Sequence, residues 1–296
     1  MFFKNYIPII FLWLAITAGV AAYEFDHAER VFAMENEEET TNISAFLIPE
    51  DEKEITQDQV SLSGLLIPDE KIISETITEE KLLPQVLIYH THTTEAFRMT
   101  AESEYQETSE WRTNDENFSV VALGKLLTEE MEKHGFAVTH DRTDHEPPKL
   151  SSSYERSLLT MEKRSEENPA LSLFIDLHRD AANIETAQDD FVLIDGKECA
   201  RIMFVVGKGE KYEDKPDFAK NYALAQAICE ELEKICPGFT RPIREKTGRY
   251  NQHAGEICLL VEVGHNANTL EQAKNTIPYL AEAIKKVFDE EKTLYG

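Results

Sequence analysis

The sequence predicts an α/β domain built on a mostly parallel, twisted sheet with helices on its faces. Beyond Pro84, short apolar runs alternate with longer segments of helical periodicity, which is the pattern of strands connected by helices. Three of these runs, 86–89, 171–177 and 257–263, are almost continuously apolar, as expected for parallel strands that are buried on both faces. With 296 residues, the chain is long enough for one such domain and additional segments.

The chain before this domain is predicted to begin with a transmembrane helix. Residues 6–23 are nearly all apolar, and about 20 residues span a bilayer as a helix. Small residues at 19–22 also fit a cleaved signal peptide, but the run exceeds the usual apolar region of about 7–15 residues. We therefore favour an uncleaved membrane anchor over residues 1–23. Lys4 precedes the run and acidic residues follow it, which predicts that the rest of the chain lies outside the cytoplasm.

An acidic spacer is predicted between the anchor and the folded domain. Residues 24–84 contain 17 Asp and Glu against four Lys and Arg, so they bury too little apolar surface to offset the entropy of ordering. A Leu-Ile-Pro-acid pattern occurs at 47–53 and again at 66–71. The repeat is interpreted either as a docking element or as a repeat that has drifted within a linker. The net charge of −26 argues against a nucleic-acid partner, because few basic groups can neutralise phosphates.

The folded domain is predicted to span residues 85–296, and its first half holds two helices. Apolar residues at helical spacing predict a helix over 118–134, which Gly135 ends before a strand over 136–140. Ser151, Ser152 and Ser153 are N-cap candidates for a second helix over 151–164.

The second half is predicted to contain a hairpin, two helices and the last strong strand. Asp195-Gly196 is a two-residue turn signal between 191–194 and 201–206. Helices are expected over 217–235 and 269–288, the latter capped by Thr269. The four cysteines show no metal-ligand spacing, and a chain of this length can build a core without disulfides.

Two histidines and a glutamate follow the first strand of the domain. The apolar residues 86–89 lead directly to His90, His92 and Glu95. Residues two apart on an extended segment point to the same side, so both histidines are expected to leave the carboxyl end of the strand together. Ligands bind at this end of the strands in open α/β sheets. The alternative is a pair of solvated loop histidines beside a surface acid.

Three strand ends carry residues of the kind that bind zinc. His92 with Glu95, His178 and Glu262 each end or follow an apolar run. Two histidines and one carboxylate can hold Zn²⁺ with its fourth position open to water, and a further carboxylate can carry a proton to a leaving amine. A carboxylate in such a run is costly unless paired or protonated, which favours Glu262 as the proton carrier over a buried acid neutralised by Arg249.

Other polar residues near these strand ends are weaker candidates. Arg179 directly follows His178 and is predicted to bind a substrate carboxylate or a transition-state oxyanion, or else to pair locally with Asp180. His140 and His145 flank another strand end and are predicted to be structural hydrogen-bonding groups.

Four short motifs together resemble the stage II sporulation protein P family. They are Tyr89–Glu95, Asp176–Asp180, Tyr250–Gln252 and Leu260–Gly264, and the resemblance covers roughly residues 85–290. The family consists of membrane-anchored peptidoglycan hydrolases of endospore-forming bacteria, and it is similar to zinc N-acetylmuramoyl-L-alanine amidases.

The resemblance implies a zinc-dependent N-acetylmuramoyl-L-alanine amidase with additional cleavage of stem-peptide crosslinks during sporulation and engulfment. It places Zn²⁺ at His92, Glu95 and His178, with Glu262 as general acid and base. His90 also matches the motif and is the alternative to His92.

The same resemblance leaves the metal carboxylate open and implies partners. Related amidases often take this glutamate from the start of the first helix, where this chain has Asp115 and Glu116, so both are alternatives to Glu95. The implied partners are stage II sporulation protein D, a glycan-strand hydrolase, and stage II sporulation protein M, a membrane scaffold. The implied location is the sporulation septum, with the domain on the extracytoplasmic side.

Two other functions fit the same residues. One is a catalytically inert wall-binding module, and the other is a zinc carboxypeptidase that acts on stem peptides. A pure binding module has little need of a buried acid such as Glu262 beside metal ligands, which favours a hydrolase.

Overall fold

The computed structural model describes residues 83–182 and 190–294, and residues 80–296 form one compact unit. The predicted anchor over residues 1–23 and nearly all of the predicted spacer over 24–84 lie outside the described residues. Within the two described ranges, no helix combines the length and the apolar character needed to cross a bilayer.

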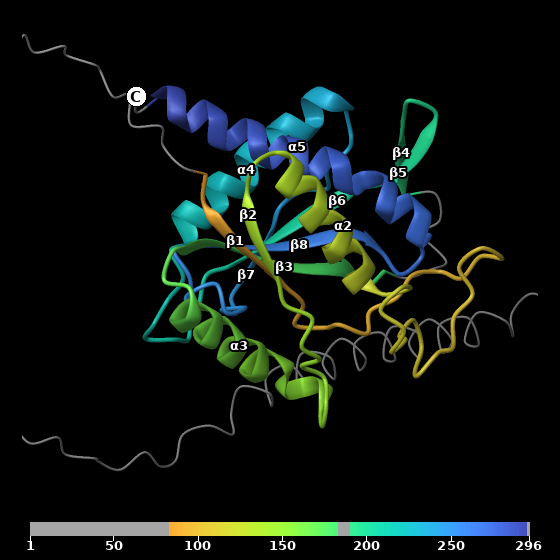
Figure 1. The fold of residues 1–296 in the computed structure, drawn as a ribbon, viewed down its shortest axis with the longest axis horizontal. Helices are drawn as coiled ribbons and strands as arrows, with labels where there is room; N and C mark the ends of the chain where they lie inside the picture. Colours follow the sequence, from red (N-terminus) through yellow and green to blue (C-terminus); the bar gives the residue numbers. More distant parts are fainter. Residues whose placement is uncertain (1–82, 183–189, 295–296) are drawn as a thin grey trace, which may run out of the picture. The chain divides into compact units, whose positions relative to one another are not determined.

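A six-stranded sheet forms the centre of the described domain, as Figure 1 shows. The strand order is β2–β1–β3–β8–β6–β7, and β2, β1, β3 and β8 run parallel to one another. β6 is antiparallel to β8, and β7 pairs parallel with β6. The prediction of a mostly parallel α/β sheet is therefore confirmed. The strands are β1 (Gln85–Tyr89), β2 (Ala137–His140), β3 (Leu171–Asp180), β6 (Ile202–Gly207), β7 (Arg244–Lys246) and β8 (Ile257–His265).

The predicted hairpin is present, but its second strand was predicted wrongly. β4 (Phe191–Ile194) pairs with β5 (Lys197–Ala200) across a two-residue turn, in which Asp195 and Gly196 have φ of 52° and 78°. A turn this short places residue 197 opposite 194. The apolar run that follows is β6, which pairs with β8 in the main sheet instead.

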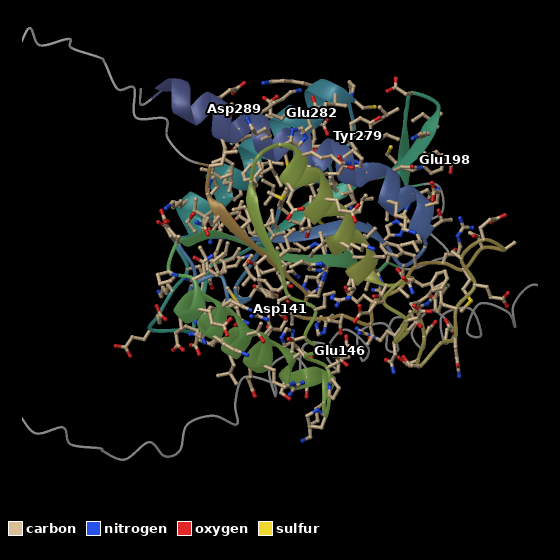
Figure 2. The ribbon with its side chains drawn as sticks, viewed as in Figure 1. Asp141, Glu146, Glu198, Tyr279, Glu282 and Asp289 are labelled. Carbon is tan, nitrogen blue, oxygen red and sulfur yellow. The ribbon has the colours of Figure 1, made fainter. Side chains whose placement is uncertain are left out.

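Three helices cover one face of the sheet and one helix covers the other (Figure 1). α2 (Val120–Lys133), α4 (Phe218–Ile235) and α5 (Leu270–Leu294) lie on the first face, and α3 (Ser153–Glu167) lies on the second. Figure 2 labels Asp141 and Glu146 on the side of α3, away from the labelled residues of α5.

The helix starts follow local capping chemistry, with one exception. The predicted cap Thr269 accepts a hydrogen bond from the backbone N–H of Gln272, and Ser119 and Asp217 cap α2 and α4. Ser152 precedes α3 without a side-chain capping bond, because a short 3₁₀ turn, Leu150–Ser152, leads into that helix.

The sheet is buried on both sides, which explains its continuous apolar runs. Val86 and Ile88 of β1 belong to the core under α2, α4 and α5, whereas Leu87 and Tyr89 pack toward Met161 of α3. Since side chains alternate along a strand, the position of a residue in the run decides which helix layer it meets.

Candidate active site

His178 and Glu262 lie side by side on the face of the sheet that α3 covers. β3 and β8 are parallel neighbours, and His178 is directly paired with Glu262 in their register. Phe174 and Cys258 of the same two strands belong to the core cluster of α3, and even-numbered residues of both strands share that face. β3 was predicted to end at Leu177, but it continues through Asp180, so His178 is fixed within the strand rather than in a loop.

The turn after β1 brings His92 and Glu95 to the same place. Nδ1 of His178 is 3.3 Å from Oε2 of Glu95, and the rings of His92 and His178 have centroids 5.5 Å apart. Thr94 and Glu95 are held from outside the turn, because their carbonyl oxygens accept the backbone N–H groups of Thr113 and Val120. The structure therefore brings together the predicted residues His92, Glu95, His178 and Glu262.

His90 does not accompany His92 as the sequence predicted. Its Nδ1 donates to the carbonyl oxygen of Leu177 at 2.8 Å, and its Nε2 lies 2.9 Å from Nε2 of His140. A side chain at Gly124 of α2 would collide with both rings, so His90 faces the α2 layer. β1 ends at Tyr89, and the bend that follows breaks the alternation on which the prediction rested. This placement favours His92 over His90 as the metal ligand.

His140 and His145 are structural, in agreement with the prediction. A neutral imidazole carries a single N–H. Because His90 uses its own for the Leu177 carbonyl, Nε2 of His140 must donate to Nε2 of His90. His145 joins the carbonyl oxygen of His90 to the hydroxyl of Thr160, both at 2.8 Å.

The buried pair of His90 and His140 is expected to make stability depend on pH. Burial lowers the pKa of His140 to about 4 and that of His90 to about 3, whereas a histidine of the unfolded chain titrates near 6.5. Between these values only the unfolded chain binds the protons, so this contribution is complete above about pH 6.5 and is lost as the pH falls toward 4.

We expect His140→Gln to reduce the loss of unfolding free energy between about pH 7 and 5 by about 1–2 kcal/mol. Urea unfolding of both proteins at the two pH values measures this difference. The matched control is His134→Gln at the end of α2, which removes a histidine outside the buried pair. Equal pH dependence of His140→Gln and the wild type would contradict the prediction.

Neighbouring charges shift the pKa values of Glu95 and His178 and favour the charged form of each. Burial raises the pKa of Glu95, but the Arg179 guanidinium and His178 outweigh it and hold that pKa well below the usual range. Burial lowers the pKa of His178, but Asp176 and Glu95 outweigh it and hold that pKa well above its usual value. The two side chains therefore form a direct ion pair.

The pKa of Glu262 is shifted in the opposite direction to that of Glu95. Burial raises the pKa of its carboxyl group well above that of a solvated glutamate, and the nearby Glu95 and Asp180 carboxylates add to the rise against the opposing charges of His178 and Arg241. Its Oε2 is buried and makes no hydrogen bond. A carboxyl group whose pKa is raised toward neutral pH can both accept and release a proton near that pH, which suits it to proton transfer.

The guanidinium group of Arg179 interacts with backbone carbonyls and with the Glu95 carboxylate of the protein itself. It is buried, with Nε donating to the carbonyl oxygen of Ala96 and Nη2 to that of Trp111, both at 2.9 Å. Its Nη1 lies 3.8 Å from Oε1 of Glu95, and its backbone N–H donates to Oε2 of the same carboxylate. These contacts fit a residue that holds Glu95 in place better than one that binds an oxyanion.

A sequence model described as stage II sporulation protein P (SpoIIP) matches residues 10–285 of the chain. The chain belongs to the stage II sporulation protein P family. Stage II sporulation protein P of Bacillus subtilis (strain 168) is 29% identical over 219 residues, which cover 70% of this chain and 52% of that protein. The chain thus spans about half the length of the curated relative that it matches.

Among solved structures, the chain is similar to an amidase and to the catalytic domain of an endolysin. The CwlD amidase from Clostridioides difficile, solved in complex with the GerS lipoprotein, is 15% identical with a TM-score of 0.46 and covers 71% of this chain and 99% of its own. The catalytic domain of the CD27L endolysin targeting Clostridia difficile is 13% identical with a TM-score of 0.43 and covers 68% and 94%.

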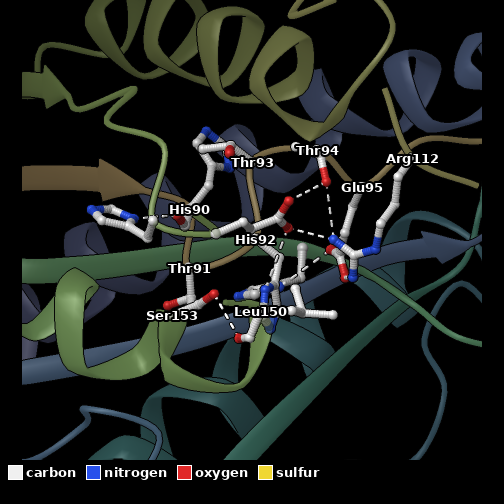
Figure 3. A network of polar contacts seen from close by, with 12 residues as sticks. His90, Thr91, His92, Thr93, Thr94, Glu95, Arg112, Leu150 and Ser153 are labelled. Atoms are coloured by element: carbon white, nitrogen blue, oxygen red, sulfur yellow. Dashed lines mark hydrogen bonds and ion pairs between the residues drawn. The ribbon is translucent and has the colours of Figure 1, made fainter. Parts of the chain in front are cut away.

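In this SpoIIP-family chain, Arg112 and Glu146 also lie at the edge of the site. Sequence analysis did not single out either residue. Arg112 donates to the hydroxyl of Thr94 at 3.0 Å and pairs with the Glu146 carboxylate, which also accepts from Thr94. Oε1 of Glu146 lies 3.5 Å from Nδ1 of His92. Figure 3 shows Arg112 approaching Thr94 and Glu95 from a separate segment. Both residues lie in irregular segments, so no periodicity marked them.

The alternative metal carboxylates lie elsewhere. Glu116 is exposed and pairs with Arg142 at 2.8 Å, and Asp115 is exposed and accepts from the backbone and side chain of Asn117. Of these three carboxylates, Glu95 is therefore the one that contacts His178.

The donor set at the site fits a zinc ion. No three His, Cys, Asp or Glu side chains among the described residues are already arranged as a complete metal site. However, Nδ1 of His92 and Oε2 of Glu262 are buried without hydrogen bonds, and Glu95 and His178 contact each other directly. Nitrogen and carboxylate donors in this combination are typical ligands of zinc.

Proposed function

We propose that this chain is a zinc-dependent peptidoglycan hydrolase that cleaves the amide between N-acetylmuramic acid and L-alanine during sporulation. Membership of the SpoIIP family supports the sporulation role, and the similarity of that family to zinc N-acetylmuramoyl-L-alanine amidases supports the bond. The observation that carries the proposal is geometric: the buried Oε2 of Glu262 makes no hydrogen bond, and Glu262 is paired in register with His178, which contacts Glu95.

Each residue has a distinct role in the proposed reaction. His92, Glu95 and His178 would hold the ion, and zinc bound there supplies Lewis acidity that polarises a carbonyl and activates water. Glu262 takes the proton of the attacking water and delivers it to the leaving amine nitrogen. Arg179 keeps Glu95 in place through its ion pair and its bonds to two backbone carbonyls.

Mass spectrometry of the products from purified peptidoglycan tests this function. An amidase releases stem peptides with a free L-alanine amino group and leaves intact glycan strands. Loss of only single terminal residues would indicate a carboxypeptidase instead, and cleaved crosslinks would add endopeptidase activity. Binding to the wall without any product would indicate an inert module and contradict the proposal.

We also propose that residues 1–23 hold the domain on the outer face of the membrane, on the strength of the apolar run that begins at Tyr6. Protease added to intact protoplasts is then expected to cut within the acidic residues 24–84 and to release a compact fragment. Protection of that segment until the membrane is lysed would contradict this topology.

The stage II sporulation proteins D and M are proposed as partners on the family resemblance alone. Co-purification of either protein with the chain after extraction from sporulating cells tests the proposal. Failure of both to co-purify under conditions that retain the hydrolase activity would count against it.

A further inference from the structure

The carboxylate of Asp176 lies at the centre of a buried hydrogen-bond network next to the site. Its Oδ1 accepts the backbone N–H of Thr91 at 2.8 Å, and its Oδ2 accepts the hydroxyl of Thr91 at 2.7 Å. Both residues have at most 1% of their surface exposed. Both oxygens of the carboxylate thus accept hydrogen bonds from Thr91, the residue that precedes His92.

The network continues into two other motifs of the chain. The Thr91 hydroxyl lies 2.8 Å from that of Ser157 in α3, and the side-chain amide of Asn251 donates to the Ser157 hydroxyl at 3.0 Å. The same amide also donates to the carbonyl oxygen of Tyr154. Because an ionised carboxylate only accepts hydrogen bonds, Thr91 donates to Asp176 and is left to accept from Ser157.

Asp176 is also the nearest charged partner of His178. The two residues are two apart on β3 and share one face, and Oδ1 of Asp176 lies 2.8 Å from Nε2 of His178. This oxygen lies off the direction of the ring N–H, since Nε2 makes no hydrogen bond, so the contact is an ion pair. Nδ1, the other ring nitrogen, faces Glu95 at 3.3 Å.

We propose that Asp176 is a positioning residue that engages Nε2 of His178, so that Nδ1 is the nitrogen that His178 presents to Glu95 and to a bound zinc ion. This inference rests on the proposed zinc site. A carboxylate that faces the far nitrogen of a ligating histidine favours a proton on that nitrogen by its charge and leaves the other nitrogen free for the metal. Loss of such a partner typically weakens metal affinity about 10–100-fold. The network of Thr91, Ser157 and Asn251 in turn fixes the carboxylate.

Asp176→Asn in the full chain tests the proposal. We expect zinc affinity, measured by competition with a chromophoric chelator, to fall about 10–100-fold. The matched control is Asp141→Asn, because Asp141 is also buried on the α3 side of the sheet but pairs with Arg164 at 2.7 Å. Zinc affinity of the control should remain unchanged.

Two further measurements keep the test decisive if Asp176→Asn does not fold. Thr91→Val removes one hydroxyl donor to Asp176 while keeping the carboxylate, and it should weaken zinc binding by a smaller factor. Nitrogen-15 NMR of the zinc-loaded wild type should show the metal-induced shift at Nδ1 of His178 and a proton on Nε2.

Wild-type zinc affinity in a folded Asp176→Asn, or a metal-induced shift at Nε2 of His178, would overturn the inference. A wild-type chain that binds no zinc would overturn both this inference and the proposed metal site. A chain that binds zinc as expected but releases nothing from peptidoglycan would overturn the proposed function and leave the role of Asp176 standing.

Discussion

Glu262→Gln is expected to lower peptide release from purified peptidoglycan by about 10²–10⁴-fold, the usual contribution of a general acid–base group. Glutamine keeps the shape of the side chain but cannot accept or deliver a proton. The paired position of Glu262 beside His178 and its unpartnered Oε2 place that proton transfer next to the proposed metal ligands. Rates are compared by mass spectrometry of released peptides over time.

Zinc content and thermal stability separate this effect from a loss of folding. We expect Glu262→Gln to retain one zinc ion per chain, because Glu262 is proposed to carry protons and not to bind the metal. The matched control is Glu256→Gln, which lies just before β8, is exposed and pairs with Lys220 at 2.9 Å; its activity should be that of the wild type. Full activity of Glu262→Gln would contradict the mechanism at its central step.

Loss of either metal histidine is expected to abolish stoichiometric zinc binding. His92→Ala and His178→Ala each remove one of three proposed ligands, so zinc affinity should fall by more than the roughly 100-fold limit typical of an outer partner. Glu95→Gln should also weaken binding, since a neutral amide replaces an anionic ligand. Metal analysis after dialysis against buffer of defined free zinc measures the occupancy.

The two histidine variants should differ in the stability of the metal-free protein. His178 lies between the buried carboxylates of Asp176 and Glu95, and breaking a buried ion pair from one side typically costs about 3–5 kcal/mol. His92 makes edge contacts with the rings of Tyr154 and His178 and a 3.5 Å approach to Glu146, so its loss should cost less. Full zinc occupancy in both histidine variants would contradict the ligand assignment. If Glu262→Gln lost its zinc while Glu95→Gln retained it, Glu262 would be the metal ligand and Glu95 the proton carrier.

The layers of the fold and the strand ends that carry the site could be predicted from the sequence. Parallel strands buried on both faces have to be continuously apolar, so β1, β3 and β8 could be located within a few residues. Because the carboxyl ends of parallel strands meet at one edge of the sheet, His178 and Glu262 could be predicted to lie at the same edge. Their direct pairing became visible only with the strand order.

The direction of the side chains that follow the strand ends depends on tertiary contacts. Thr91 is fixed by Asp176, 85 residues further along the chain, and this bond lies in the bend that sends His90 toward α2 and His92 toward His178. The roles of Arg112, Glu146 and Asp176 also depend on partners from other segments. Local spacing predicts side-chain direction only while a strand or helix continues; beyond its end, hydrogen bonds to distant residues set the direction.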